Sequence, residues 1–194
     1  MQVYLIRHGE SEANAAGIHS GWLPVNLTAL GRRQARETAA LIAEVTFDRI
    51  IVSDLVRARQ TAEIIFPGRE KQLCADIREL DTSHLAGRKV SALREELGKA
   101  YLNARRDFDY GPLGCESREA FLSRTERFFH SLEALDCERL AVVAHAGVIR
   151  ALGAFAMNLP ILQFNVPVFN CSVSVLEHAD GAWRMLRWNC GRLG

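Results

Sequence analysis

The sequence has 194 residues, of which 48% are hydrophobic, and its 24 basic and 23 acidic side chains nearly balance. This length and hydrophobic share are typical of one globular domain with a core of its own, and they argue against a disordered chain. A formal net charge of +1 gives no argument for a nucleic-acid or membrane partner, so any basic site must be local.

The five cysteines are scattered and include no Cys-x-x-Cys pair, which argues against a zinc ribbon or a dithiol redox motif. We expect them to be small thiols in a reducing compartment. The first residues lack a basic segment followed by a long apolar stretch, and no apolar run has membrane-spanning length. The sequence therefore predicts a cytoplasmic protein without a secretory signal.

The first predicted strand runs over residues 3–6 and leads directly into Arg7, His8 and Gly9. A short, continuous apolar run of this kind is typical of a strand that is buried on both faces. Ligands of open α/β sheets bind at the carboxyl ends of such strands, where the arginine and histidine would lie. Gly9 lets the backbone turn sharply and approach a ligand closely. The segment therefore predicts an anion site.

Residues 11–27 are rich in Gly, Pro, Ser and Asn, and they are predicted to form a loop. Within this loop we expect Trp22 to contribute plain packing. Thr28 is a suitable N-cap for a helix over residues 29–44, whose charged residues would form a solvated face.

A second buried strand is predicted over residues 49–52, and Ser53 and Asp54 at its end can cap the next helix. That helix has one apolar stripe at helical spacing and should end near Pro67. Arg57 lies in its first turn, off the stripe. An arginine there is unfavourable with respect to the helix dipole, and it is better explained if an anion binds beside it.

The middle of the chain is predicted to be mainly helical. A weaker strand over residues 72–75 precedes a charged helix over residues 88–110, and Ser117 caps a clear amphipathic helix.

A third strong strand is predicted over residues 140–144 and leads directly into His145, after which another helix follows. Two strands near residues 171–177 and 182–188 close the chain, joined by an Asp-Gly pair that is typical of a hairpin turn.

This order of elements predicts an α/β fold: a three-layer α/β/α sandwich with a mostly parallel sheet. No repeat or linker is visible, so we expect one domain over residues 1–194, with a small helical cap over about residues 82–115.

Polar side chains of a matching kind follow three of the predicted strands: Arg7 and His8, Arg57, and His145. Taken singly, each has an ordinary structural explanation. If the strands are parallel neighbours, however, the four side chains converge at one edge of the sheet. Guanidinium groups match phosphate oxygens and stabilise charge during phosphoryl transfer, and a histidine can accept the phosphoryl group covalently. The pattern therefore predicts a phosphoryl-transfer site.

The segment Arg7-His8-Gly9-Glu10 resembles the signature of the histidine phosphatase superfamily, also called phosphoglycerate mutase-like. Further blocks are similar to those of the family, in the same order and over nearly the whole chain. These blocks are Glu10-Ser11 with Asn14, Ser20-Gly21, Leu27-Thr28 with Gly31 and Gln34-Ala35, residues 53–62, Arg78-Glu79-Leu80-Asp81, Cys115-Glu116-Ser117, and Val143-Ala144-His145-Ala146-Gly147.

The resemblance implies catalytic roles for five residues. His8 would be the nucleophile that forms a phosphohistidine, while Arg7, Arg57 and His145 would hold the phosphoryl oxygens. Glu79 would protonate the leaving oxygen and later activate water. No metal or cofactor is implied, because the arginines and histidines supply the positive charge.

Phosphate or substrate binding is expected at Asn14, Ser20, Gly21 and Ala146. The residues alone leave a second interpretation of Glu79 open, as a surface carboxylate paired with its neighbour Arg78. The pair Arg105-Arg106 could contact an anionic substrate, or it could be ordinary exposed charge on a helix.

The short cap and the early end of the chain after its last hairpin favour a phosphatase over a cofactor-dependent mutase. Residues 12–17, 20–21 and 171–176 look most like the α-ribazole phosphatases. However, Thr82-Ser83-His84-Leu85-Ala86-Gly87 stands where these usually have Phe-Gly-x-Trp-Glu-Gly, and residues 21–24 lack an aspartate often seen there. The predicted partner is a small phosphorylated metabolite, and a broad-specificity phosphatase is also compatible.

Two alternatives of other classes stay open from the sequence. One is a cofactor-dependent phosphoglycerate mutase, which is an isomerase. The other is a non-catalytic module that binds a phosphorylated ligand or a protein.

Overall fold

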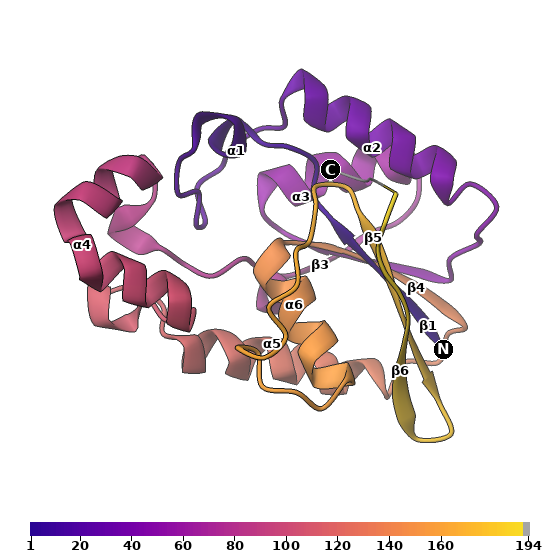
Figure 1. Cartoon of the computed structure of the whole chain (residues 1–194). Helices are drawn as coiled ribbons and strands as arrows, with labels where there is room; N and C mark the ends of the chain where they lie inside the picture. The colour runs from indigo at the N-terminus through magenta and orange to yellow at the C-terminus, as the bar shows by residue number, and fades with distance from the viewer. Residues whose placement is uncertain (192–194) are drawn as a thin grey trace.

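The structure, a computed structural model, describes residues 1–191, so residues 192–194 of the predicted domain lie outside the described residues. Its centre is a six-stranded sheet with the order β3-β2-β4-β1-β5-β6 (Figure 1). The strands are β1 (Gln2–Arg7), β2 (Arg49–Ser53), β3 (Gln72–Cys74), β4 (Arg139–Ala144), β5 (Val173–Ala179) and β6 (Ala182–Cys190). The first four run parallel, while β5 and β6 are antiparallel to their neighbours, which confirms the mostly parallel sheet.

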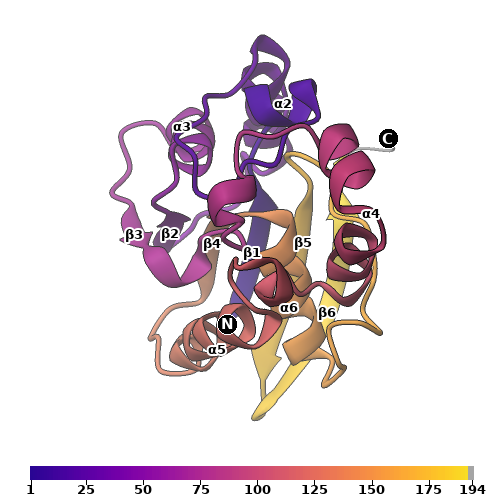
Figure 2. The same ribbon diagram turned by 90° about the vertical axis from the view of Figure 1, so that its left-hand side faces the viewer.

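Helices cover both faces of this sheet, as the predicted sandwich requires. The helices are α1 (Glu12–Ala16), α2 (Ala29–Leu41), α3 (Val56–Ile65), α4 (Val90–Asp107), α5 (Arg118–Leu132) and α6 (Ala146–Ala156), with 3₁₀ turns at Ala75–Ile77, Ser83–Leu85 and Gly111–Leu113. One core lies between the sheet and α2 and α3, and the second lies between the sheet and α5 and α6. Figure 2 shows α5 and α6 in front of the central strands.

The central strands are buried on both faces, which explains their continuous apolar runs. In β1, Leu5 contributes to the core under α5 and α6, whereas Ile6 contributes to the opposite core. The same alternation holds for Val142 and Val143 of β4. Side chains that point alternately to two cores must all be apolar, so no polar residue interrupts these strands.

The strand β4 lies between β1 and β2, and all three run in the same direction. In the register, Arg7 pairs with Ala144 and Val52 pairs with Val143, so these three strands end at one edge. The backbone N–H of His8 continues the ladder to the carbonyl of Ala144, at 3.0 Å. The convergence that was predicted for the strand ends is therefore confirmed.

A pair of glycines fixes the turn after β1 against the start of α2. A Cβ atom on Gly31 would overlap the backbone of Glu10, and one on Gly9 would lie 2.5 Å from the carbonyl oxygen of Gly31. The two backbones can pass this close only because neither residue has a side chain.

The predicted loop over residues 11–27 is wrong in one part, because it contains the short helix α1. Ser11 caps this helix: its side chain accepts from the backbone N–H of Asn14, whose side chain accepts from the N–H of Ser11. A helix of five residues has too few apolar positions to show a period.

The start of α3 also differs from the prediction. Its N-cap is Leu55, without a side-chain cap, so Ser53 and Asp54 do not cap it. Ser53 instead bonds His145, and Asp54 pairs with Arg78. Both polar side chains are used in contacts between elements.

The region of the predicted cap contains α4, which Figure 1 shows on the left of the molecule, on the side where α1 lies. It is joined to the loop after α1 by an antiparallel bridge between Ile18 and Lys89. The predicted helix over residues 88–110 is not regular, because Gly98 inside α4 has non-helical backbone angles (φ 50°, ψ −122°). Among residues 1–191, no helix has the length and apolar character needed to cross a membrane.

Candidate active site

Two buried histidines lie next to each other at the edge where β1, β4 and β2 end. The ring centroids of His8 and His145 are 5.1 Å apart, and the rings are inclined by 57°. The Nδ1 atom of His8 lies 2.7 Å from the carbonyl oxygen of Gly9. A carbonyl only accepts, so Nδ1–H donates this bond and the lone pair of the neutral ring is on Nε2. His8 thus presents a nucleophilic nitrogen.

The pKa values of both histidines lie well below the usual value of 6.5. Burial is the main cause for each ring, and the positive charge of Arg57 is the second. Arg7 acts on both rings in the same direction, and each ring therefore stays neutral near pH 7.

Two guanidinium groups lie beside the histidines. Arg57, on the first turn of α3, is 1% exposed and donates to the carbonyl oxygens of Gly21 at 2.9 Å and Leu23 at 3.4 Å. Burial lowers its pKa to about 10. Arg7 donates to the carbonyl of Val168 at 2.6 Å, and burial lowers its pKa as well. The Nε atoms of both arginines are buried and have no hydrogen-bond partner among the described residues.

Glu79 lies close to the same site, since its carboxylate reaches the start of α6 two residues after His145. Its carboxylate accepts two backbone N–H groups, from Leu80 at 3.0 Å and from Gly147 at 3.1 Å. A Cβ atom on Gly147 would overlap this carboxylate, so a larger residue there would displace the side chain of Glu79 from its present place. Arg78 pairs with Asp54, at 2.7 Å, and therefore the alternative interpretation of Glu79 as the partner of Arg78 is wrong.

A cleft of about 360 Å³ is lined by two of these groups, Arg7 and Glu79, whereas His8, Arg57 and His145 are not part of its lining. Its charged lining residues are Arg7, Glu79, Arg105 and Arg150, and its aromatic lining residues include Tyr101, Phe108 and Tyr110. A larger hollow of about 460 Å³ lies between the ends of α5 and α6, but none of the predicted site residues lines it. The chemistry is therefore assigned to the smaller cleft.

Comparisons with known proteins agree with this geometry. The family model of the histidine phosphatase superfamily (branch 1) matches residues 3–191. The chain belongs to the histidine phosphatase superfamily. The predicted family is confirmed, and with it the prediction of an enzyme of the phosphatase class.

Relatives of two kinds are similar to this histidine phosphatase. An adenosylcobalamin/alpha-ribazole phosphatase of Salmonella typhimurium is 35% identical over 82% of this chain and 81% of the relative. A probable phosphoglycerate mutase, GpmB, of Proteus mirabilis is 32% identical over 97% and 90%. Among solved structures, the alpha-ribazole phosphatase from Shigella flexneri superimposes with a TM-score of 0.91 at 29% identity, covering 100% of this chain and 98% of that one.

The structure places most of the predicted binding residues of this histidine phosphatase at the cleft. Ser20, Gly21 and Ala146 line it. Asn14 does not, because it is exposed and its side-chain oxygen accepts from Ser11 in the cap of α1. The two arginines of α4 that were predicted to contact an anionic substrate, Arg105 and Arg106, also differ in position. Arg105 lines the cleft, whereas Arg106 faces outward and pairs with its neighbour Asp107.

Two residues near the site were missed in the sequence. Arg150 lines the cleft, its guanidinium lies 5.5 Å from the ring centre of Phe108, and its Nε atom is buried without a partner among the described residues. It follows Ala146 by four residues on α6, so helical spacing could have indicated it. Asn170 donates to the carbonyl of His8 at 2.9 Å and lies 3.4 Å from the side-chain oxygen of Asn14. No sequence signal links it to them.

Trp22 also differs from its prediction as a packing residue. Its indole N–H donates to the backbone carbonyl of Glu79 at 2.7 Å, and the guanidinium of Arg78 covers its ring at 4.6 Å. The loop after α1 is thereby tied to the segment that carries Glu79.

We expect the stability of the ligand-free protein to fall as the pH is lowered below about 6.5. Since the pKa values of His8 and His145 are depressed in the folded state, the unfolded chain binds more protons in this range. The free energy of unfolding should then decrease by up to about 2.7 kcal/mol per pH unit for the two rings together. Urea unfolding between pH 7.5 and 5 in a buffer without phosphate measures this slope.

A bound phosphate favours the charged imidazoles, so added phosphate should reduce the slope. The exposed His130 serves as the control, since H130A should leave the slope unchanged. A free energy of unfolding that is constant from pH 7.5 to 5.5 would contradict the assignment of neutral histidines.

Proposed function

We propose that the chain hydrolyses phosphomonoesters through a phosphohistidine intermediate on His8. The observation that supports this best is the cluster at the sheet edge: two neutral histidines 5.1 Å apart, with the buried guanidinium of Arg57, the partly buried guanidinium of Arg7 and the carboxylate of Glu79 near them. The cluster combines a nucleophile, groups that neutralise phosphate, and a group that can exchange a proton.

In the first step, Nε2 of His8 attacks phosphorus while the ester P–O bond breaks. A proton passes from the carboxyl group of Glu79 to the leaving oxygen. In the second step, the Glu79 carboxylate takes a proton from water as the water oxygen attacks phosphorus. The N–P bond breaks, phosphate is released, and both side chains return to their starting states.

Arg7, Arg57 and His145 hold the phosphoryl oxygens in this proposal. Ser53 Oγ lies 2.8 Å from Nε2 of His145 and accepts from the N–H of Leu55, so its hydroxyl hydrogen is available to the ring. When Ser53 donates this hydrogen to Nε2, the ring hydrogen of neutral His145 is on Nδ1, which is buried without a partner among the described residues. This N–H can donate to a phosphoryl oxygen.

For the substrate, we propose α-ribazole 5′-phosphate or a similarly sized phosphorylated metabolite. Two relatives named as alpha-ribazole phosphatases support this choice. Tyr101, Phe108 and Tyr110 at the cleft can pack against the aromatic base of such a nucleotide. The similarity to a probable phosphoglycerate mutase supports one second candidate, mutase activity.

A panel of three assays in the presence of EDTA tests the proposal. The enzyme should release phosphate from p-nitrophenyl phosphate and, with a higher kcat/KM, from α-ribazole 5′-phosphate. It should not interconvert 2- and 3-phosphoglycerate when bisphosphoglycerate is added. Interconversion without net phosphate release would instead identify a mutase, and binding of phosphate without turnover of any ester would identify a binding module.

A further inference from the structure

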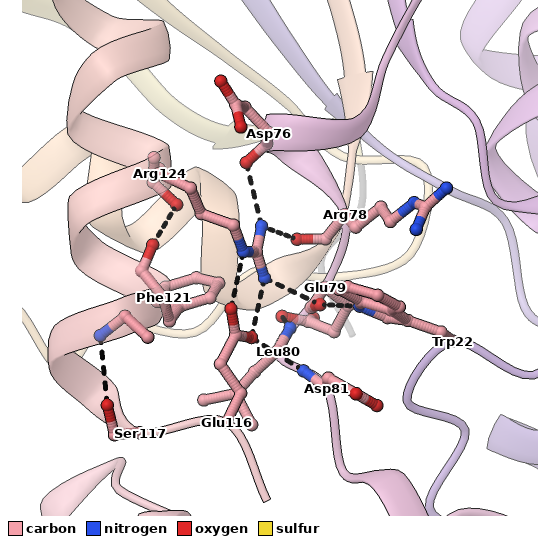
Figure 3. Close-up of polar contacts among 12 residues, drawn as sticks. Trp22, Asp76, Arg78, Glu79, Leu80, Asp81, Glu116, Ser117, Phe121 and Arg124 are labelled. Carbon is pink, nitrogen blue, oxygen red and sulfur yellow. Dashed lines mark hydrogen bonds and ion pairs between the residues drawn. The ribbon is translucent and has the colours of Figure 1, made fainter.

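Arg124 of α5 is 8% exposed and makes five hydrogen bonds (Figure 3). Two go to the carboxylate of Glu116, at 2.7 and 2.9 Å. The other three go to the backbone carbonyls of Asp76 at 2.8 Å, Arg78 at 2.6 Å and Glu79 at 3.0 Å. The three nitrogens of a guanidinium carry five N–H donors, so every donor of Arg124 is used.

Glu116 holds the same segment on its other side. Its carboxylate accepts from the backbone N–H of Asp81 at 2.9 Å, and its own N–H donates to the carbonyl of Asp81 at 3.1 Å. Arg124 and Glu116, which form an ion pair, therefore bind the backbone both before and after Glu79.

The carbonyl of Glu79 has a second donor, the indole of Trp22, at 2.7 Å. Figure 3 shows Arg124 and Trp22 on different sides of this carbonyl. Between these two contacts, the backbone of Glu79 is restrained from α5 and from the loop after α1. The side chain of Glu79 then reaches the N–H of Gly147 at the start of α6.

We propose that Arg124 is a positioning residue for the carboxyl group of Glu79. Buried ion pairs contribute little net stability, because desolvation of the two charges offsets their attraction. The three hydrogen bonds from Arg124 to backbone carbonyls instead fix the position of the chain that carries Glu79. The proposal rests on the proposed function, in which Glu79 protonates the leaving oxygen.

The test compares two substrates that differ in their need for a proton. The leaving group of p-nitrophenyl phosphate departs without much protonation, whereas the alkoxide of glycerol 2-phosphate needs it. We compare kcat/KM, which reports only the steps up to phosphohistidine formation, because the later water step is the same for both substrates. We expect R124M to lower kcat/KM on glycerol 2-phosphate by about 100-fold and on p-nitrophenyl phosphate by less than about fivefold. E79Q should show the same selective loss, and it should be larger.

Arg127 provides a matched control on the same helix. It is exposed and binds the side chain of Asp76 instead of the backbone. R127M should change kcat/KM on either substrate by less than about twofold. If R124M does not fold, R124K replaces it in the test. Lysine keeps the positive charge but lacks the planar set of donors of a guanidinium, so we expect the same selective loss.

Three outcomes are distinguishable. Selective loss in E79Q and in the Arg124 variants supports the proposal. Selective loss in E79Q together with equal loss on both substrates in the Arg124 variants overturns it, because Arg124 then serves the fold alone. No selectivity in E79Q means that Glu79 is not the acid, which overturns the proposed mechanism and the positioning role with it.

Discussion

Replacement of His8 by alanine is expected to lower the rate of p-nitrophenyl phosphate hydrolysis by about 10⁴-fold or more. Among the described residues, Nε2 of His145 contacts the hydroxyl of Ser53, whereas Nε2 of His8 has no hydrogen-bond partner. Only His8 can therefore offer its Nε2 lone pair to phosphorus. Without this nitrogen the reaction loses its covalent step. Steady-state kinetics of H8A and of the exposed control H130A measure the effect.

Trapping of the intermediate gives a second readout for this variant. Brief incubation with a labelled phosphomonoester and quenching in base should leave label on the wild-type chain, and acid should then remove it, as expected for a phosphoramidate. H8A should carry no label. Label on H8A would place the nucleophile elsewhere and contradict the proposed mechanism.

Replacement of Arg57 by methionine is expected to lower kcat/KM by about 10³-fold, because the proposed mechanism then loses one of its two guanidiniums that stabilise the transferring phosphoryl group. The ligand-free protein should lose little stability. Burial has lowered the pKa of Arg57 to about 10, so its charge is already disfavoured in the fold. Activity and thermal unfolding with and without vanadate measure both effects.

Arg59 is the control for this variant, since it lies on the same helix but is exposed. R59M should retain activity and the stabilisation by vanadate, whereas R57M should lose both. Because Arg57 also depresses the pKa values of both histidines, R57M should weaken the pH dependence of stability below pH 6.5. Full activity of R57M would show that Arg57 has no part in the reaction.

The strand ends could be predicted because the signal is local. An apolar run buried on both faces and followed at once by Arg7 and His8, or by His145, defines both the strand and its functional end. Arg57 was visible for a similar reason, as a cation in the first turn of a helix where the dipole disfavours it.

The supporting contacts could not be predicted, because their partners are distant in sequence and ordinary in type. Arg124 and Glu116 look like surface charges on an amphipathic helix and its cap, and only the folded chain brings them against residues 76–81. Asn170 precedes the final hairpin and reaches His8 across 162 positions. No pattern of spacing carries such pairings.

The glycine pair of Gly9 and Gly31 has a consequence for how this enzyme class can diversify. The turn after His8 packs backbone against backbone on the start of α2. Aromatic residues that line the cleft, such as Tyr101, Phe108 and Tyr110, come from a different stretch of the chain. Substitutions in that stretch can therefore reshape the cleft without moving the turn that follows His8.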